Sequence, residues 1–179
     1  MKKFLIIQTA FIGDVVLATA LVEKLHQYHP EASIDFLLRK GNEVLLKDHP
    51  YINRVLVWDK NNGKYRDLYR IWKEIRGSRY DHVINIQRFA ATGWITAFSG
   101  AGERIGFDKN PFSMFFSKSV KHIISTAEKQ LHETERNQML IEHLTGNIPA
   151  KPRLYPTLSD LNHVASFKHR PYICIAPAS

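Results

Sequence analysis

Strand patterns and helix patterns alternate along most of this chain, and that alternation restricts the fold more than any other feature of the sequence. Short apolar runs that lack a regular exchange of apolar and polar residues are each followed by a stretch with apolar residues at helical spacing. The expected strands are 3–8, 33–38, 54–58, 81–86 and 104–107, and the expected helices are 14–28, 41–47, 65–76, 89–98 and 132–144. Strands without polar alternation are typical of a parallel sheet covered by helices on both faces. We therefore predict a doubly wound α/β fold.

The length of the chain suits one main domain. With 179 residues and 44% hydrophobic content, the chain can bury one sizeable core, and we expect residues 1–150 to form it. Segment 151–171 contains several prolines outside any periodic pattern and is predicted to be a connector between domains. Residues 172–179 look like the first strand of a second domain that is cut short, with a short C-terminal edge strand as the alternative.

The N-terminal apolar run is not expected to be an export signal. Two lysines precede it and Ala18-Thr19-Ala20 follows, as in a signal peptide, but Gly13 and Asp14 interrupt the apolar core. No stretch reaches the ~18 unbroken apolar residues of a membrane span. The single cysteine, Cys174, has no partner for an intrachain disulfide, which suits a reducing compartment. We therefore expect a cytoplasmic protein.

The charge of the chain favours anionic partners. Lysine and arginine exceed aspartate and glutamate by 25 to 17, a net charge of +8, which suits phosphates, acidic sugars, nucleic acid or an anionic membrane surface. Half of the excess lies in segment 59–79. There, Tyr65, Leu68 and Trp72 recur at helical spacing and are predicted to face the core of an amphipathic helix. A solvated outer face is the simpler interpretation of most of its basic residues.

The loop 9–14 after the first expected strand is the first candidate site, because open parallel sheets bind ligands where strands lead into helix N-termini. Gly13 would let a ligand approach the backbone, and the free N–H groups of a helix start favour negative charge. Asp14 fits two roles. It could cap those N–H groups, which is worth about 1 kcal/mol, or it could act as a general base toward a hydroxyl group. The pattern leaves both open.

Other kinds of site are disfavoured by what the motifs lack. The loop has neither the G-x-G-x-x-G fingerprint nor a P-loop lysine, which argues against tight pyrophosphate binding and against a nicotinamide-dependent oxidoreductase. The histidines show no H-E-x-x-H spacing and no pairing with cysteine, so no metal site is expected. His132 and Arg136 are four residues apart and would share one helix face. A helix start stabilised by Glu133 and Glu135 is the simpler interpretation of that segment.

Several motifs together resemble the bacterial heptosyltransferases of glycosyltransferase family 9. They are FLII followed by FIGDVVL in residues 4–17, YDHVINIQ in 80–87, RIGF in 104–107, His132 with Arg136, and YICIAPAS in 172–179. The resemblance implies a GT-B architecture of two Rossmann-like domains, with this chain as the N-terminal, acceptor-binding half. It further implies inverting transfer of heptose from ADP-heptose to the lipopolysaccharide inner core, with Asp14 as the general base and without a metal or other cofactor.

The same resemblance implies an acceptor site rich in basic residues. Arginine and lysine form charge-assisted hydrogen bonds with carboxylates and phosphates, and the candidates for acceptor binding are Gly13, Lys64, Arg88, Arg104, His132 and Arg136. The nucleotide-sugar donor is expected to bind the missing C-terminal half, so this chain is expected to be inactive alone. We also expect a peripheral contact with the cytoplasmic face of the inner membrane, and we expect no nucleic-acid partner.

A non-catalytic function is the alternative. A basic α/β module could bind nucleic acid or an anionic membrane through the helix of segment 60–79. Its affinity would fall steeply with salt and would survive substitution of Asp14.

Overall fold

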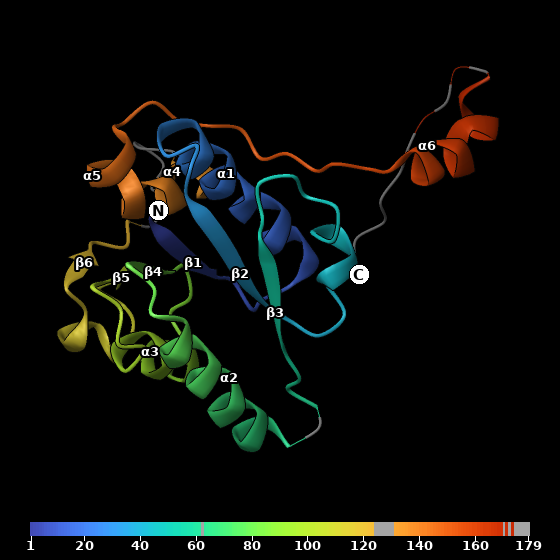
Figure 1. Cartoon of the computed structure of the whole chain (residues 1–179). Helices are drawn as coiled ribbons and strands as arrows, with labels where there is room; N and C mark the ends of the chain where they lie inside the picture. Colours follow the sequence, from blue (N-terminus) through green and yellow to red (C-terminus); the bar gives the residue numbers. More distant parts are fainter. Residues whose placement is uncertain (62, 124–130, 170, 172, 174–179) are drawn as a thin grey trace.

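The computed structural model describes all residues except 62, 124–130, 170, 172 and 174–179, and its centre is one parallel sheet (Figure 1). The strands are β1 (Lys3–Ile7), β2 (Ser33–Arg39), β3 (Arg54–Trp58), β4 (His82–Asn85), β5 (Glu103–Phe107) and β6 (Lys118–Val120). They lie in the spatial order β3-β2-β1-β4-β5-β6, and every neighbouring pair is parallel. The predicted doubly wound α/β fold is confirmed.

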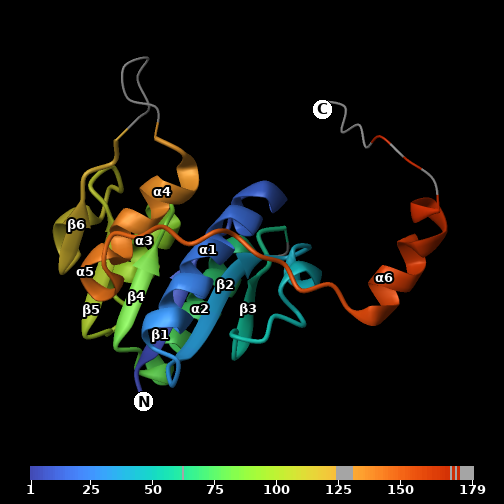
Figure 2. The same cartoon turned by 90° about the horizontal axis from the view of Figure 1, so that it is seen from above.

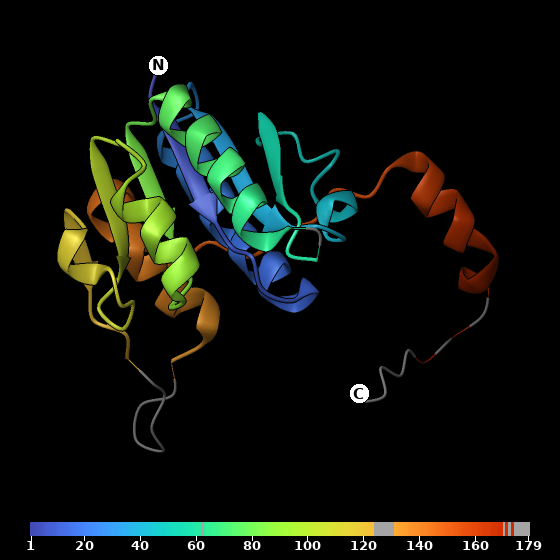
Figure 3. The ribbon, with the colours of Figure 1, turned by 90° about the horizontal axis from the view of Figure 1, so that it is seen from below.

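Helices cover both faces of the sheet, as the views from above and below show (Figures 2 and 3). The helices are α1 (Ile12–Tyr28), α2 (Lys64–Ser78), α3 (Ala90–Ala97), α4 (Glu133–Gln138), α5 (Glu142–Thr145) and α6 (Leu158–Ala165). Short 3₁₀ turns are η1 (Glu43–Leu45), η2 (Ser113–Phe115), η3 (Met139–Ile141) and η4 (Ser166–Lys168). Helix α1 and the α4–α5 region pack on one face, and α2 and α3 pack on the other.

Strand β1 shows why both faces must be covered. Phe4 and Ile6 belong to the core under α1, whereas Leu5 and Ile7 belong to the core under α2 and α3. Successive side chains of a strand point to opposite faces, so a run of four apolar residues requires an apolar layer on each side. All four side chains are fully buried.

The structure differs from the elements predicted from the sequence in four places. The expected helix 41–47 is reduced to the 3₁₀ turn η1. Strand β6 was not expected, and the expected helix 132–144 is divided into α4, η3 and α5. The expected connector 151–171 contains a helix, α6, whose first turn is closed by a capping box between Thr157 and Asp160. That T-x-x-D pattern is a start signal visible in the sequence. The expected strand within 172–179 falls almost entirely outside the described residues and stays a prediction.

The segment before α6 lies along α1 and is tied to it by hydrogen bonds (Figure 2). The backbone N–H of Arg153 donates to Thr19 Oγ1 at 2.9 Å, and the Tyr155 hydroxyl donates to Glu23 Oε1 at 2.9 Å. Helix α6 then extends away from the sheet (Figure 1). None of the helices in the described part of the chain combines the length and the apolar character that crossing a bilayer requires.

A buried carboxylate joins β2, β3 and the start of β4. Asp35, 3% exposed, accepts hydrogen bonds from Tyr80 at 2.5 Å, from Asn53 at 2.9 Å and from two nitrogens of Arg54 at 2.8 and 3.0 Å. This group of donors surrounds a charge that would otherwise be costly to bury.

We expect Asp35→Ala to destabilise the fold, because it leaves the buried Tyr80 hydroxyl and the Asn53 amide without their acceptor. The expected loss in the free energy of unfolding is about 3 kcal/mol, the low end for a broken buried pair because the Arg54 side chain is 45% exposed. Equilibrium urea unfolding measures it. Asp48→Ala, at an exposed aspartate, is the control, and equal losses in the two variants would contradict the prediction.

Candidate functional site

The candidate site lies between β1 and β4, where the direction in which successive strands are added to the sheet reverses. Successive strands lead from β1 outward to β3 on one side, and from β4 outward to β6 on the other. The loops that leave β1 and β4 therefore diverge, and such switch points are where open α/β sheets bind ligands. A cavity of about 560 Å³ opens there, between the two loops, the start of α1 and α4. We call it the Asp14 cavity; its lining residues are Gln8, Thr9, Ala10, Phe11, Asp14, Arg39, Lys60, Ile86, Gln87, Arg88, Phe89, Phe107, His122, Glu133, Arg136 and Asn137.

Asp14 is the only acidic residue of the first turn of α1 and caps that turn. Its Oδ2 accepts a hydrogen bond from the backbone N–H of Phe11 at 3.0 Å. Among the described residues, Oδ1 has no hydrogen-bond partner, and the side chain is partly exposed at the cavity wall. One oxygen thus performs the capping role that the sequence left open, while the other faces a space where a ligand can sit.

Gly13, next to Asp14 in the first turn, is exposed and is not among the residues that line the Asp14 cavity. A Cβ atom added to it would meet no atom within 4 Å, and its φ is not positive. Neither the packing nor the backbone conformation therefore demands glycine here.

Four basic side chains from four different elements line the Asp14 cavity. Two of them, Arg88 after β4 and Arg136 on α4, are among the candidates for acceptor binding. Arg39 at the end of β2 and Lys60 just after β3 join them, and neither was among the candidates. Their signal in the sequence is a basic residue at the carboxyl end of an expected strand, which is the edge where ligands bind.

Lys60 connects the loop after β3 to the loop after β1. Its Nζ donates to the carbonyl oxygen of Thr9 at 2.7 Å and to Thr9 Oγ1 at 3.2 Å, and it lies 4.7 Å from the centre of the Trp58 ring. Burial lowers the pKa of Lys60, and the nearby charges of Arg39 and Lys64 lower it further. An anion beside it would favour the charged form.

The wall formed by α4 and the segment after β6 carries polar groups without partners. His122 Nδ1, Arg136 Nε and Asn137 Nδ2 are buried and have no hydrogen-bond partner in the described part of the chain. Burial lowers the pKa of His122, and the charges of Arg136 and Arg88 act in the same direction. The imidazole is therefore neutral at pH 7, within an electropositive wall.

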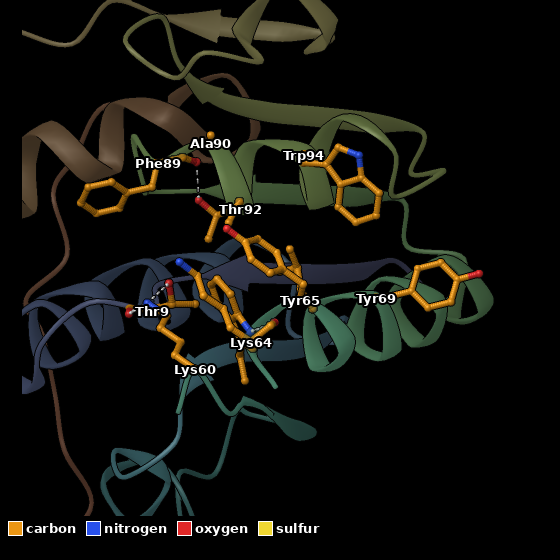
Figure 4. Close-up of a pocket in the computed structure, with 12 residues that line it drawn as sticks. Thr9, Lys60, Lys64, Tyr65, Tyr69, Phe89, Ala90, Thr92 and Trp94 are labelled. Atoms are coloured by element: carbon orange, nitrogen blue, oxygen red, sulfur yellow. Dashed lines mark hydrogen bonds between the residues drawn. The ribbon is translucent and has the colours of Figure 1, made fainter. Parts of the chain in front are cut away.

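Lys64 lies in a neighbouring cavity of about 770 Å³ between α2 and α3 (Figure 4). Thr9, Lys60 and Phe89 line both cavities. Tyr65, which was expected in the core, is 76% exposed at this cavity, and the Lys64 ammonium lies 5.5 Å from the centre of its ring. The cause of the wrong prediction is that Leu68, Ile71 and Ile75 supply the buried stripe of α2.

Two further predicted site residues are not brought to the Asp14 cavity. Arg104 lies at the start of β5, the opposite end of the strand from the ligand edge, and its guanidinium donates to the carbonyl oxygens of Ala101 at 3.0 Å and Phe115 at 3.2 Å. His132 is the N-cap of α4, with Nδ1 accepting from the backbone N–H of Thr134 at 3.3 Å. Of the expected pair His132 and Arg136, only Arg136 lines the cavity.

The described residues contain no group of three or more His, Cys, Asp or Glu side chains that could hold a metal ion.

Comparison with known proteins identifies the family. A model of glycosyltransferase family 9 (heptosyltransferase) matches residues 68–179. The chain belongs to glycosyltransferase family 9. A lipopolysaccharide core heptosyltransferase, OpsX, from Haemophilus influenzae is 26% identical over 106 residues, which are 59% of this chain and 30% of that protein. The resemblance seen in the sequence motifs is thus confirmed.

Solved structures support the fold of this family 9 chain. A glycosyl transferase family 9 from Veillonella parvula matches with a TM-score of 0.77 and 20% identity, over 93% of this chain and 48% of that one. The ADP-heptose lps heptosyltransferase II of Escherichia coli matches with a TM-score of 0.70 and 18% identity, over 94% of this chain and 51% of that one. The chain therefore spans about half the length of these structures and corresponds to one Rossmann-like half of a GT-B glycosyltransferase.

The charge of Arg136 is predicted to hold down the pKa of His122. Arg136→Met keeps a long side chain and removes the charge, so the pKa of His122 should rise toward the ordinary ~6.5. The NMR titration of the His122 ring, assigned with a His122→Gln variant, measures this. Arg153→Met, which removes an arginine stacked on Tyr155, should leave the pKa of His122 unchanged, and no rise in Arg136→Met would contradict the prediction.

The lowered pKa of His122 also predicts how the stability of the fold changes at acid pH. The unfolded chain takes up a proton at His122 more readily than the folded chain, so His122 lowers the stability as the pH falls below about 6.5.

Proposed function

We propose that this chain is the acceptor-binding half of a heptosyltransferase that transfers heptose, with inversion, from ADP-heptose to an acidic sugar of the lipopolysaccharide inner core. Family membership supports glycosyl transfer, and the names of OpsX and of the Escherichia coli enzyme support this donor and acceptor class. The observation that carries the proposal is the placement of Asp14, with one oxygen free of hydrogen-bond partners among the described residues, in a cavity with Arg88 and Arg136.

Asp14 is the general base in this mechanism. Its Oδ1 takes the proton of the acceptor hydroxyl while that oxygen attacks the anomeric carbon of heptose from the face opposite ADP. The bond between the anomeric carbon and the phosphate oxygen breaks, and ADP leaves with the electron pair. The hydrogen bond from Phe11 N–H to Oδ2 holds the carboxylate in place while Oδ1 accepts the proton, and proton transfer of this kind contributes about 10²–10⁴ to the rate.

Basic residues bind the acceptor in this proposal. Arg88 and Arg136 approach the cavity from different elements and provide planar donors for a carboxylate or phosphate. Arg39 and Lys60 add positive charge from the other side of the cavity. Gly13 is exposed beside Asp14, and the acceptor is proposed to contact its backbone. Lys64 is placed one cavity away, where it could contact a second acidic group of an extended acceptor.

The donor is assigned to the other half of the enzyme. The loop 9–14 lacks the glycine fingerprint for pyrophosphate, and the matched structures are about twice the length of this chain. We therefore propose that residues 1–150 are the acceptor domain, 151–171 the connector and 172–179 the start of the donor domain, and that this chain is inactive alone. The proposal includes a cytoplasmic location, a peripheral contact with the inner membrane and no nucleic-acid partner.

The alternative, a binding module that acts through the basic face of α2, receives less support. Arg70 on that face is paired with Asp67 at 2.6 Å and with Glu74 at 3.4 Å. Arg76 donates to the carbonyl oxygen of Phe98 at 3.2 Å. These cations are committed to contacts within the chain, as expected for a solvated helix face.

We expect Asp14→Asn in the full-length enzyme to lower kcat at least 100-fold. The amide keeps the shape of the side chain and an oxygen that can accept from Phe11 N–H, but it cannot take a proton. Transfer of heptose from ADP-heptose to an inner-core acceptor measures the effect.

Asp160→Asn is the matched control for that experiment. Asp160 accepts from the backbone N–H of Thr157 at 2.8 Å, so it caps α6 as Asp14 caps α1, yet it lies outside the cavity. Activity within a few-fold of the unmodified enzyme in Asp14→Asn would remove Asp14 as the base. Equal losses in both variants would assign the effect to capping.

The location of the donor site predicts that ADP binds poorly to the 179-residue chain. Isothermal titration calorimetry should show no micromolar affinity for the chain and clear binding for the full-length enzyme. Micromolar binding by the chain would place the donor site on this half and contradict the proposal.

A further inference from the structure

We propose that Asn110 is a positioning residue that directs Arg88 into the Asp14 cavity, and that Gly93 provides the space this arrangement requires. The inference rests on the proposed function of that cavity. Neither residue lines the cavity. They act on the loop after β4, which carries Arg88.

The side-chain amide of Asn110 holds the carbonyl oxygens of the two residues next to Arg88 in the chain, Gln87 and Phe89. Its Nδ2 donates to the carbonyl oxygen of Gln87 at 3.0 Å and to that of Phe89 at 3.2 Å. With both flanking carbonyls bound to one nitrogen, the backbone at Arg88 cannot rotate freely. The direction of the Cα–Cβ bond of Arg88 is thereby fixed, while its exposed side chain remains available to a ligand.

Asn110 is itself held firmly in the loop after β5. It is 2% exposed, its backbone N–H donates to Phe107 at 3.1 Å, and its Oδ1 accepts from the N–H of Phe112 at 2.9 Å. The Phe112 N–H also fixes which end of the amide is oxygen, so the nitrogen must face the two carbonyls. The amide therefore links the loop after β5 to the loop after β4, which are distant in the sequence.

Gly93 on α3 is explained by the same amide. A Cβ atom at this position would lie 1.9 Å from Asn110 Oδ1, 2.7 Å from its Cγ and 2.8 Å from its Nδ2. Any side chain at residue 93 would push the amide away from the loop. The backbone of Gly93 does not adopt a positive φ. Glycine is therefore required because a side chain would not fit, and not because of the backbone conformation.

Asparagine is the residue whose chemistry fits this position. Its amide offers two N–H donors on one nitrogen and one acceptor oxygen. Aspartate has nearly the same shape and keeps the acceptor for Phe112, but it has no N–H donor and would place a carboxylate against two carbonyl oxygens. Asn110→Asp therefore removes the positioning contacts at almost constant volume.

A double-mutant cycle in the full-length enzyme tests the proposal. We expect Asn110→Asp to raise the KM for the acceptor about tenfold, given that a misplacement of about 1 Å can cost about 100-fold, while the KM for ADP-heptose stays within twofold. In an Arg88→Ala background the same substitution should change the acceptor KM less than twofold, because the side chain that it misdirects is gone. Equal effects in both backgrounds would show a general structural role and overturn the proposal.

Ser113→Ala is the matched control in the same loop. Its hydroxyl donates to the carbonyl oxygen of Asp108 at 3.0 Å and makes no hydrogen bond to the loop after β4. This variant should leave the acceptor KM unchanged. If Asn110→Asp does not fold, as judged by thermal unfolding, Asn110→Ser is the milder variant for the same cycle.

Amide hydrogen exchange separates this proposal from the proposed function. In Asn110→Asp, the amides of residues 87–90 should exchange at least tenfold faster, and those of β2 should not change. If Arg88→Ala leaves the acceptor KM unaltered, the acceptor role of Arg88 is wrong and exchange alone decides whether Asn110 holds the loop. Unchanged exchange at 87–90 would overturn the positioning proposal whatever the activity shows.

Discussion

The pairing of β1 with a parallel strand on each side is the interaction on which the rest of the structure depends. Residues 4–7 pair with both β2 and β4, and their side chains are completely buried on the two faces. Because β1 is central, the chain must leave it toward β2 and return on its other side as β4. The loops after β1 and β4 then separate, and the polar residues Gln8 and Thr9 follow directly at the opening. The position of the cavity is thus a consequence of strand order.

The positive charge of the cavity comes largely from the same edge of the sheet, the one formed by the carboxyl ends of the strands. Arg39, Lys60 and Arg88 come from the carboxyl ends of different strands, and Arg136 approaches from α4. These positive charges repel one another; among the described residues Arg136 has a carboxylate partner in Glu133 at 3.8 Å, and the Asp14 carboxylate lines the same cavity. The lowered pKa values of Lys60 and His122 are consequences of this burial and repulsion. A carboxylate or phosphate in the cavity, such as the proposed acceptor carries, would act on both pKa values in the opposite direction.

Capping and catalysis need not compete for Asp14, because a carboxylate has two oxygens. The hydrogen bond that Oδ2 accepts from Phe11 N–H holds the carboxylate, and it leaves Oδ1 for the proposed acceptor hydroxyl. Asp160 makes the same kind of cap on α6, away from the cavity, so capping by itself identifies no site. The distinction lies in the surroundings: only Asp14 caps a helix that begins at the switch point of the sheet.

The sequence by itself determined the layered α/β fold, the loop that carries Asp14 and the family, because apolar periodicity and short motifs are local properties. Tertiary structure decided which basic residues meet. Arg39 ends β2 and Arg88 follows β4, and both reach one cavity, whereas Arg104 lies near the start of β5, at the opposite edge of the sheet. His132 is used as a helix cap. The physical reason is that distances between remote residues depend on strand order and on the end of the strand at which each side chain lies. Periodicity along the chain encodes neither.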